Sequence, residues 1–369
     1  MHINLFLVPF VIILGILFGN NDTKIGRRLY ILLCSAVLIF VASMRSPEWT
    51  AFSYGIDTQA YKDYFEASFD MDWDDFWSSV YGRYVGVNDE SDVGFLGLVR
   101  LIGLFTHDFA IYSLIADLIF FIPFGIILYR YCDRIIQITF AFVFYIALLQ
   151  VFFLGGGRQM FAIGFDLMAL LATIDRKKIQ AIVFSLIAIS IHFSAILFIA
   201  PLLMIWFGIK PRTLKSLHLF CLLLFPLVFA FPNQVIVFMG DSVGMEKYVS
   251  YGKAAVVGGA NTFIFLILLL SLFCYIAIKR DDLQRNNILR MFYVMAPLMT
   301  FFAPLIRSNG SMIRISLYYH LFLSLLVPYS IDCMYDKGTR RVMYVMAIGG
   351  LALLTMLNSG AEYYFYWQR

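Results

Sequence analysis

Long apolar runs separated by short polar turns dominate the chain. Continuous runs occupy residues 3–19, 109–129, 135–154, 214–231, 261–279, 312–332 and 342–358. Runs of about 17–20 residues are long enough to cross the bilayer core as helices, at about 1.5 Å per residue. A transmembrane barrel would instead alternate apolar and polar residues in segments of about ten. The pattern predicts an all-α fold, a polytopic transmembrane helix bundle.

Two apolar segments do not fit a single ordinary span. Residues 92–107 are too few to cross and predict an interfacial or re-entrant helix. The segment 179–209 is too long for one ordinary span and rather short for two. It therefore predicts a hairpin of two short helices with its tip near His192. Together the runs predict about twelve spans in one integral membrane domain over residues 1–369, with both termini outside.

Basic residues set the expected orientation. They gather in short turns at 24–28, 130–134, 176–178, 210–215, 279–290 and 337–341, which the positive-inside rule places in the cytoplasm. The opposite side then receives a first periplasmic loop with its interfacial helix, 45–107, and a second loop, 233–260. The turn at 307–311 lies on that same side.

The composition excludes a soluble domain. Hydrophobic residues make up 61% and charged residues 14% of the chain, against about 25% charged residues in soluble domains. The five cysteines have no metal-type spacing. We therefore expect membrane lipids around the chain, and neither a metal, a cofactor nor a nucleic-acid partner.

Arg158 is the first candidate for chemistry. It follows three glycines and begins an apolar run at its outer end. Such an arginine can simply extend to the lipid headgroups. However, a glycine run leaves backbone amides open at a helix start, where anions are favoured. The stretch is not a Walker loop, because it lacks the Lys-Ser/Thr ending.

Further arginines lie on the same predicted side. Arg45 ends the second span, and Arg307 and Arg314 flank a polar turn. Each alone could anchor a helix at the membrane interface. Taken with Arg158, they favour a polyanionic ligand, which planar guanidinium groups bind well.

The stretch "YGIDTQAYKDYF" at 54–65 combines carboxylates with aromatic rings, a combination that suits sugars. Gly55 precedes Asp57 there, and Thr58 and Tyr61 follow it. The alternative is a solvated acidic loop folded over the membrane. His192 likewise fits either a packing residue or an acid/base group.

Several short motifs, spread over nearly the whole chain, occur in an order that is distinctive as a combination. They are Arg45, the Gly-x-Asp-Thr-x-x-Tyr run from Gly55 to Tyr61, "DVGF" at 92–95, Arg158 with Gln159, His-Phe-Ser-Ala at 192–195, and Arg-x-x-x-Tyr from Arg314 to Tyr318. This combination resembles the EpsG-like branch of the Wzy oligosaccharide repeat-unit polymerases, O-antigen or exopolysaccharide polymerases.

The resemblance implies a bacterial inner-membrane glycosyltransferase similar to the GT-C superfamily. Such an enzyme would transfer a growing glycan from undecaprenyl pyrophosphate to the non-reducing end of a lipid-linked repeat unit, on the periplasmic side, with inversion and without a metal. A copolymerase that sets chain length is a further implied partner. The product, lipopolysaccharide O-antigen, capsule or exopolysaccharide, stays open.

The resemblance also suggests roles for individual residues. Asp57 would be the general base, with His192 as a second catalytic candidate. The pyrophosphate-binding residues would be Arg45, Arg158, Arg307 and Arg314, and the substrate-binding residues Gly55, Thr58, Tyr61, Gln159 and Tyr318.

Other functions share parts of this pattern. An O-antigen ligase would use the same donor, and a flippase or transporter of the lipid-linked oligosaccharide would also need arginines in a polar cavity. A transporter should show pseudo-symmetric halves and charge open to both faces, whereas the candidates here collect on one side. A non-enzymatic assembly partner would not need Arg158 and Arg314 at one polar pocket.

Overall fold

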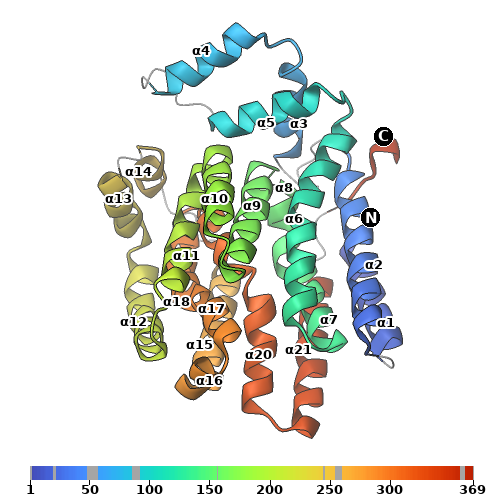
Figure 1. Cartoon of the computed structure of the whole chain (residues 1–369), viewed down its shortest axis with the longest axis vertical. Coiled ribbons are helices and arrows are strands. Elements are labelled where there is room, and N and C mark those ends of the chain that lie inside the picture. The colour runs from blue at the N-terminus through green and yellow to red at the C-terminus, as the bar shows by residue number, and fades with distance from the viewer. Residues whose placement is uncertain are drawn as a thin grey trace. The chain divides into compact units, whose positions relative to one another are not determined.

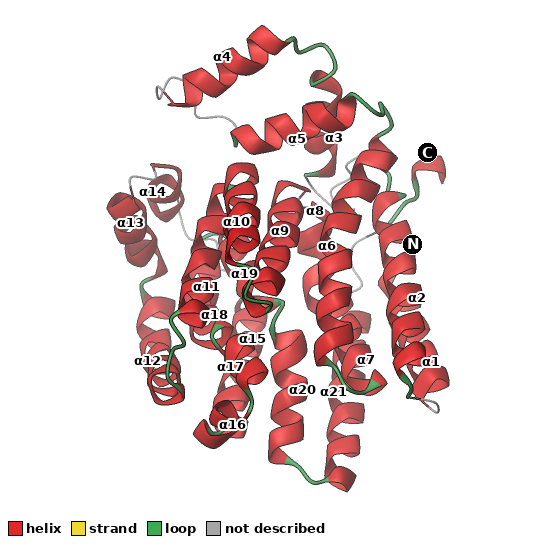
Figure 2. Cartoon of the chain, viewed as in Figure 1, coloured by secondary structure: helices red, strands yellow, loops and turns green. Residues whose placement is uncertain are grey.

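Helices make up most of the part of the chain that the structure describes. The computed structural model describes residues 2–19, 22–47, 57–84, 92–155, 157–243, 246–253, 260–357 and 362–368. Within these ranges helices are joined by loops and turns, and no strand is present (Figure 2). The all-α prediction is confirmed. The chain divides into two compact units, residues 1–199 with 346–369, and residues 200–345.

A group of packed helices forms most of the first unit (Figure 1). They are α1 (Asn4–Gly19), α2 (Lys24–Ser43), α6 (Phe109–Tyr131), α7 (Ile135–Phe144), α8 (Gln150–Gly155), α9 (Gly157–Ile174) and α10 (Lys178–Ile191). A π-helical turn, η1 (Tyr145–Leu149), joins α7 to α8, and a 3-10 helix, η2 (Phe193–Phe198), follows α10. The helices α2, α6, α9 and α10 pack in that order, each against the next.

Three short helices occupy one end of the first unit. They are α3 (Thr58–Ala67), α4 (Trp73–Tyr84) and α5 (Val93–Gly103), and α5 packs on both α3 and α10 (Figure 1). The apolar segment at 92–107 therefore forms the predicted short helix. Its first turn meets the last turn of α10, which places the start of α5 beside His192.

The second unit is also helical. It contains α12 (Pro211–Ala230), α13 (Pro232–Val243), α14 (Glu246–Lys253), α15 (Asn261–Ala277), α16 (Arg280–Arg285), α17 (Asn287–Tyr293), α18 (Met295–Phe302), η3 (Ala303–Arg307), η4 (Gly310–Met312), α19 (Ile313–His320) and α20 (Leu323–Met334). The predicted second loop at 233–260 folds, where it is described, mainly as the paired helices α13 and α14. The helices α11 (Ile199–Trp206) and α21 (Lys337–Leu357) cross the boundary between the units.

Membrane-spanning character is clear from length and composition. Among the described residues, 7 helices are long and apolar enough to cross a membrane, or up to 8 if one bent pair counts as a single span. Shorter apolar helices of 10–17 residues add to them. The chain is thus a multi-pass membrane protein, and the total of about twelve spans stays a prediction.

The uninterrupted apolar pattern of residues 312–332 suggested one straight helix, but the structure differs. The chain bends by 51° between α19 and α20. The Ser324 hydroxyl donates to the Leu321 carbonyl at 2.6 Å, and the amide of Phe322 donates to Tyr319 at 3.0 Å. Serine side chains that bond backbone carbonyls compete with the helical ladder and favour bends.

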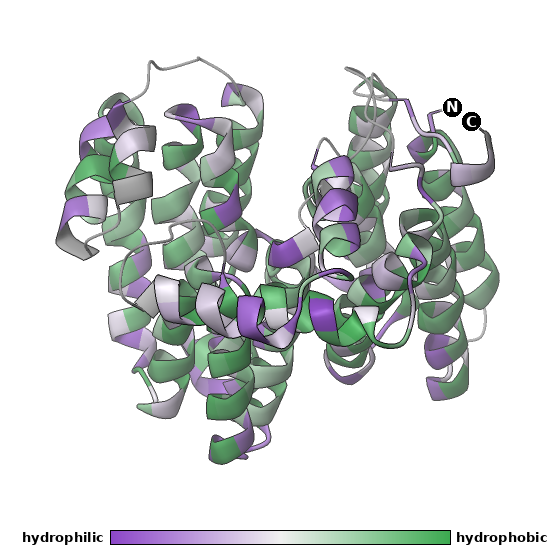
Figure 3. Ribbon diagram, turned by 90° about the horizontal axis from the view of Figure 1, so that it is seen from above, coloured by the Kyte–Doolittle hydropathy of each residue, from purple (hydrophilic) through white to green (hydrophobic). Residues whose placement is uncertain are grey.

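Hydrophobic residues prevail along the long helices (Figure 3), and many large apolar side chains on these helices are exposed. Side chains that are more than half exposed include Leu32, Ile122, Leu186, Leu223, Leu269 and Leu353. Soluble proteins rarely expose so much contiguous apolar surface. These faces are suited to contact with lipid.

Candidate active site

Arg158 lies in the first turn of α9, in the first unit, beside aromatic rings from two short helices. Its guanidinium carbon is 5.5 Å from the centre of the Phe95 ring, and the Tyr61 hydroxyl is another neighbour. The side chain of Arg158 is 23% exposed. A Cβ at Gly157 would lie 3.1 Å from the Tyr61 ring, so the glycine lets α3 approach the start of α9 closely. Arg158 is therefore held inside the unit with limited access to solvent.

Asp92 supplies a carboxylate close to Arg158. Its Oδ2 lies 3.8 Å from Nη1 of Arg158 and 3.1 Å from Nδ1 of His192. Its other oxygen, Oδ1, accepts from the Phe193 amide at 3.4 Å. The Asp92 and His192 side chains are 14% and 19% exposed. A carboxylate, an imidazole and a guanidinium thus form one half-buried cluster.

Two effects oppose each other at the Asp92 carboxyl. Burial raises its pKa, because a buried charge loses hydration. The hydrogen bond from His192 and the charges of His192 and Arg158 favour the ionised form and lower it. The partners prevail, and the pKa of Asp92 lies below its ordinary value. Asp92 is therefore a carboxylate at neutral pH.

Local sequence explains how this cluster forms. The helix α10 ends at Ile191, and His192 has extended backbone angles, φ −151° and ψ 111°, before the 3-10 helix begins. Two short helices therefore meet at a break at His192, and the predicted hairpin with its tip near this residue stays a prediction. A Cβ at Gly94 would overlap Oγ of Ser190 and lie 2.6 Å from the backbone carbon of that residue. Only glycine permits this approach, which brings Asp92 to His192.

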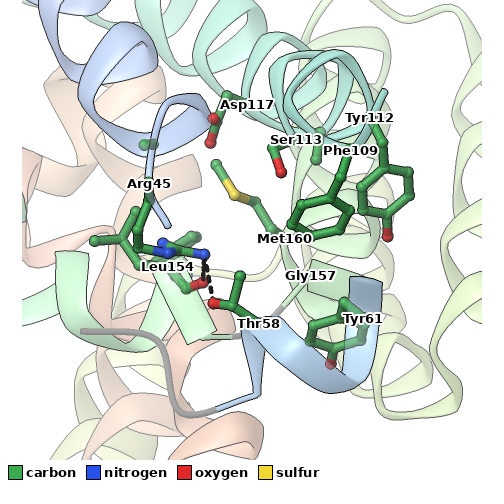
Figure 4. A pocket seen from close by; sticks show the side chains of 13 residues that line it. Arg45, Thr58, Tyr61, Phe109, Tyr112, Ser113, Asp117, Leu154, Gly157 and Met160 are labelled. Atoms are coloured by element: carbon green, nitrogen blue, oxygen red, sulfur yellow. Dashed lines mark hydrogen bonds between the residues drawn. The ribbon is translucent and has the colours of Figure 1, made fainter. Parts of the chain in front are cut away.

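Arg45 forms a second cluster, below α3. Its Nη2 donates to Oγ1 of Thr58 at 2.6 Å and to the Leu154 carbonyl at 2.7 Å (Figure 4). Its Nε and Nη1 atoms are buried, and no described group bonds to them. The bond to Thr58 shows that this threonine, predicted to bind substrate, contacts Arg45 directly.

A small cavity adjoins this guanidinium. It measures about 30 Å³ and is lined by Arg45, Thr58, Tyr61, Asp117 and Gly157, among others (Figure 4). The Asp117 side chain comes from α6 and is almost fully buried. The cavity wall is mixed, with apolar side chains as well as polar groups, and a cavity of this size has room for ordered water beside the polar groups. Tyr61 and Gly157 belong both to this wall and to the surroundings of Arg158, so the two clusters adjoin.

The remaining predicted residues of the first unit lie near these clusters or outside the described ranges. Asp57 immediately precedes α3, and its carbonyl accepts from the Tyr61 amide at 3.1 Å. Gly55 lies outside the described residues. Gln159 follows Arg158 and is buried. The structure therefore brings Arg45, Thr58, Tyr61, Arg158 and His192 to one end of the first unit.

The other predicted arginines belong to the second unit. Arg307 ends η3; its Nη1 donates to the Phe229 carbonyl at 2.7 Å, and its guanidinium carbon lies 4.6 Å from the centre of that ring. Arg314 is in the first turn of α19 and is half-buried. Tyr318, one turn later, is buried. A shared site with Arg158 stays a prediction.

Asp92 is the residue whose role the sequence left unassigned. It stands in the "DVGF" motif, where an Asp before an apolar helix looks like a helix cap. Its partner His192 is 100 residues away along the chain. Spacing gives no signal for such a pair, because only the packing of α5 on α10 brings the two together.

A family model described as the EpsG family matches residues 31–366. The chain belongs to the EpsG family. The match includes every residue of both clusters. EpsG-like proteins are Wzy-type polymerases, and the family indicates a glycosyltransferase-like membrane polysaccharide polymerase with lipid-linked saccharides as substrates. The chain matches none of the curated proteins and none of the solved structures with which it was compared.

Proposed function

We propose that this EpsG-family protein polymerises lipid-linked repeat units on the periplasmic side of a bacterial inner membrane. A growing glycan passes from undecaprenyl pyrophosphate to the non-reducing end of the next lipid-linked unit, with inversion at the anomeric carbon and without a metal. The family match supports the class of reaction. The cluster of Arg158, His192 and Asp92 carries the chemistry.

Arg158 stabilises the leaving group. Negative charge grows on the diphosphate as the glycosidic bond breaks, and a fixed guanidinium with little access to water stabilises that charge most in the transition state. Its half-buried position in the first turn of α9 supports this role, since helix N-termini also favour anions. The same role is proposed for Arg45, Arg307 and Arg314, and a single assay tests all four.

The acceptor sugar binds beside the leaving group. We place it against the Tyr61 ring, with Gly55, Thr58, Gln159 and Tyr318 as further substrate contacts. The acceptor hydroxyl loses its proton as it attacks, and Asp57 and His192 are the two candidate bases. Among the described residues, His192 has the geometry that a base requires, a ring nitrogen fixed by a carboxylate.

The full chain in liposomes provides the test. Its substrate is the diphosphate-linked repeat unit extracted from a strain that lacks this gene, and the readout is the length of the lipid-linked glycan on a gel. The wild-type chain should produce a ladder of repeats. Arg158→Ala should lower the rate at least about 100-fold, as loss of one oxyanion-stabilising donor does.

The matched control is Arg130→Ala, which removes an arginine of the same unit that pairs with Asp175 at 2.9 Å, outside both clusters. It should leave the ladder intact. Transfer of a single repeat to a non-repeat acceptor, or movement of the lipid across the bilayer without any ladder, would contradict polymerisation and indicate a ligase or a flippase.

A further inference from the structure

Asp92 stands at the position where an aspartate usually caps a helix, but it does not cap α5. It is the residue before α5, yet its side chain makes no capping bond to that helix. Aspartate at this position ordinarily accepts from the first turn of its own helix, with a contribution of about 1 kcal/mol. Here both carboxylate oxygens turn to the chain at the end of α10, to His192 and the Phe193 amide. Because Asp92 bonds to these two residues instead of its own helix, its role differs from that of a helix cap.

The bond between Asp92 and His192 determines which imidazole nitrogen carries the proton. An ionised carboxylate has only acceptors, so Nδ1 of His192 must donate. In the neutral ring Nε2 is then an acceptor with a free lone pair. A histidine held in this tautomer is ready to take a proton at Nε2 from a neighbouring hydroxyl.

We propose that Asp92 is the positioning residue that makes His192 the general base of glycan transfer, an assignment that rests on the function proposed above. Asp92 holds the ring in one tautomer and orientation. It also stabilises the imidazolium that forms when Nε2 accepts the proton, because its carboxylate lies 3.1 Å from Nδ1. Asp57 is then left to bind the acceptor sugar.

The transfer step balances with the groups present. The acceptor oxygen forms a bond to the anomeric carbon of the growing chain. The bond from that carbon to the diphosphate oxygen breaks, and its electron pair leaves with the diphosphate beside Arg158. The hydroxyl proton moves to Nε2 of His192, and the imidazolium later releases it to water. No further reactant is required.

Other ionisable groups around the pair complete the electrostatic setting. They include Arg158 from α9, and Tyr61 and Tyr64 from α3, which lie near that arginine. Arg158 alone would oppose a second positive charge on His192. The Asp92 carboxylate lies 3.1 Å from His192 and 3.8 Å from Arg158, and its negative charge offsets this repulsion at His192.

The central variant is Asp92→Asn in the liposome assay. Asparagine keeps an oxygen for the Phe193 amide, but its NH₂ group can donate to Nδ1 and so favours the opposite tautomer, with the proton on Nε2. Turnover should fall about 100- to 10,000-fold, the range of general-base assistance. KM for the lipid-linked donor should stay unchanged, since no donor contact is lost.

Three comparisons sharpen this result. Asp108→Asn is the matched control, because Asp108 also precedes a helix and does cap it, through the Ala110 amide at 2.7 Å; its turnover should equal that of the wild type. Asp92→Glu retains a carboxylate, so its turnover should fall less than that of Asp92→Asn and its pH–rate profile should keep the wild-type shape. The double variant with His192→Ala should be no slower than His192→Ala alone.

The outcomes separate the two proposals. If His192→Ala is inactive while Asp92→Asn retains full turnover, the role of Asp92 is wrong and the polymerase function stands. If the losses in the double variant multiply, Asp92 acts independently of His192, and the positioning role is again wrong. A wild-type chain that makes no ladder from the extracted repeat units would instead overturn the proposed function.

Discussion

Two histidines, one in each unit, occupy opposite environments. His192 lies at a helix break, is 19% exposed, and has a carboxylate on one nitrogen. His218, within α12, is 0% exposed, and hydroxyl groups occupy both its nitrogens: Tyr293 at 2.7 Å from Nδ1 and Ser271 at 2.8 Å from Nε2. Only the first retains a ring nitrogen that substrate could approach. The surroundings, rather than the residue type, distinguish a candidate base from a packing residue.

The largest expected effect comes from removing each histidine in turn. His192→Ala should lower polymerisation about 100- to 10,000-fold with little change in thermal stability, because it removes proton transfer. His218→Ala should leave the specific activity of the folded protein intact. It should reduce the free energy of unfolding by about 1–3 kcal/mol, since buried hydroxyls lose a partner. Gel analysis of the product and thermal unfolding in detergent measure the two effects.

His218→Gln is the matched companion, because its amide can replace one of the lost hydrogen bonds. It should recover part of the stability that His218→Ala loses. Equal loss of activity in the His192 and His218 variants, at equal amounts of folded protein, would contradict the division between the two environments.

A smaller effect is expected at the contact that positions Asp92. Gly94→Ala places a methyl group 2.6 Å from the Ser190 backbone carbon. Overpacking of this kind costs about 1–3 kcal/mol, and here it should push α5 away from α10. Turnover should fall by about 10-fold or more, because 1.4 kcal/mol corresponds to a factor of ten.

Gly338→Ala is the control for this change, since no atom lies within 4 Å of a Cβ at that glycine. Its turnover should match the wild type. The contact would be irrelevant to the site if Gly94→Ala polymerised at the wild-type rate.

The smallest effect is a pH dependence of stability. The pKa of Asp92 is lower in the folded state, so its contribution is fully present above the unfolded-state value of about 3.9 and is lost as the pH falls through the folded value. The wild type should therefore be more stable than Asp92→Asn at about pH 6, and the difference should shrink below about pH 4. Thermal unfolding of both proteins across this range measures it. A difference that grew on acidification below about pH 4 would contradict the sign.

The fold was largely predictable, because bilayer thickness forces long apolar runs to be helices. The run 109–129 corresponds to α6, and 261–279 to α15. The bend after His320 was not predictable from hydropathy, since apolar residues continue through it without glycine or proline. It depends on side-chain hydrogen bonds such as that of Ser324, which hydropathy does not register.

The candidate site was predictable only in part. The charge of Arg158 and the glycines before it marked one end of a span, and His192 stood alone among apolar residues. Their closeness, and the part of Asp92, depend on helix packing between distant segments. Arg45 was expected beside a phosphate, and the structure adds its bonds to Thr58 and Leu154.

Those two bonds of Arg45 have a consequence for access. One guanidinium joins the start of α3 to the end of α8. A saccharide that had to displace α3 from α8 would have to break at least one of these bonds, and hydrogen bonds from a charged donor are worth about 1.5–3 kcal/mol each. Entry by that route would therefore draw on the binding energy of the saccharide.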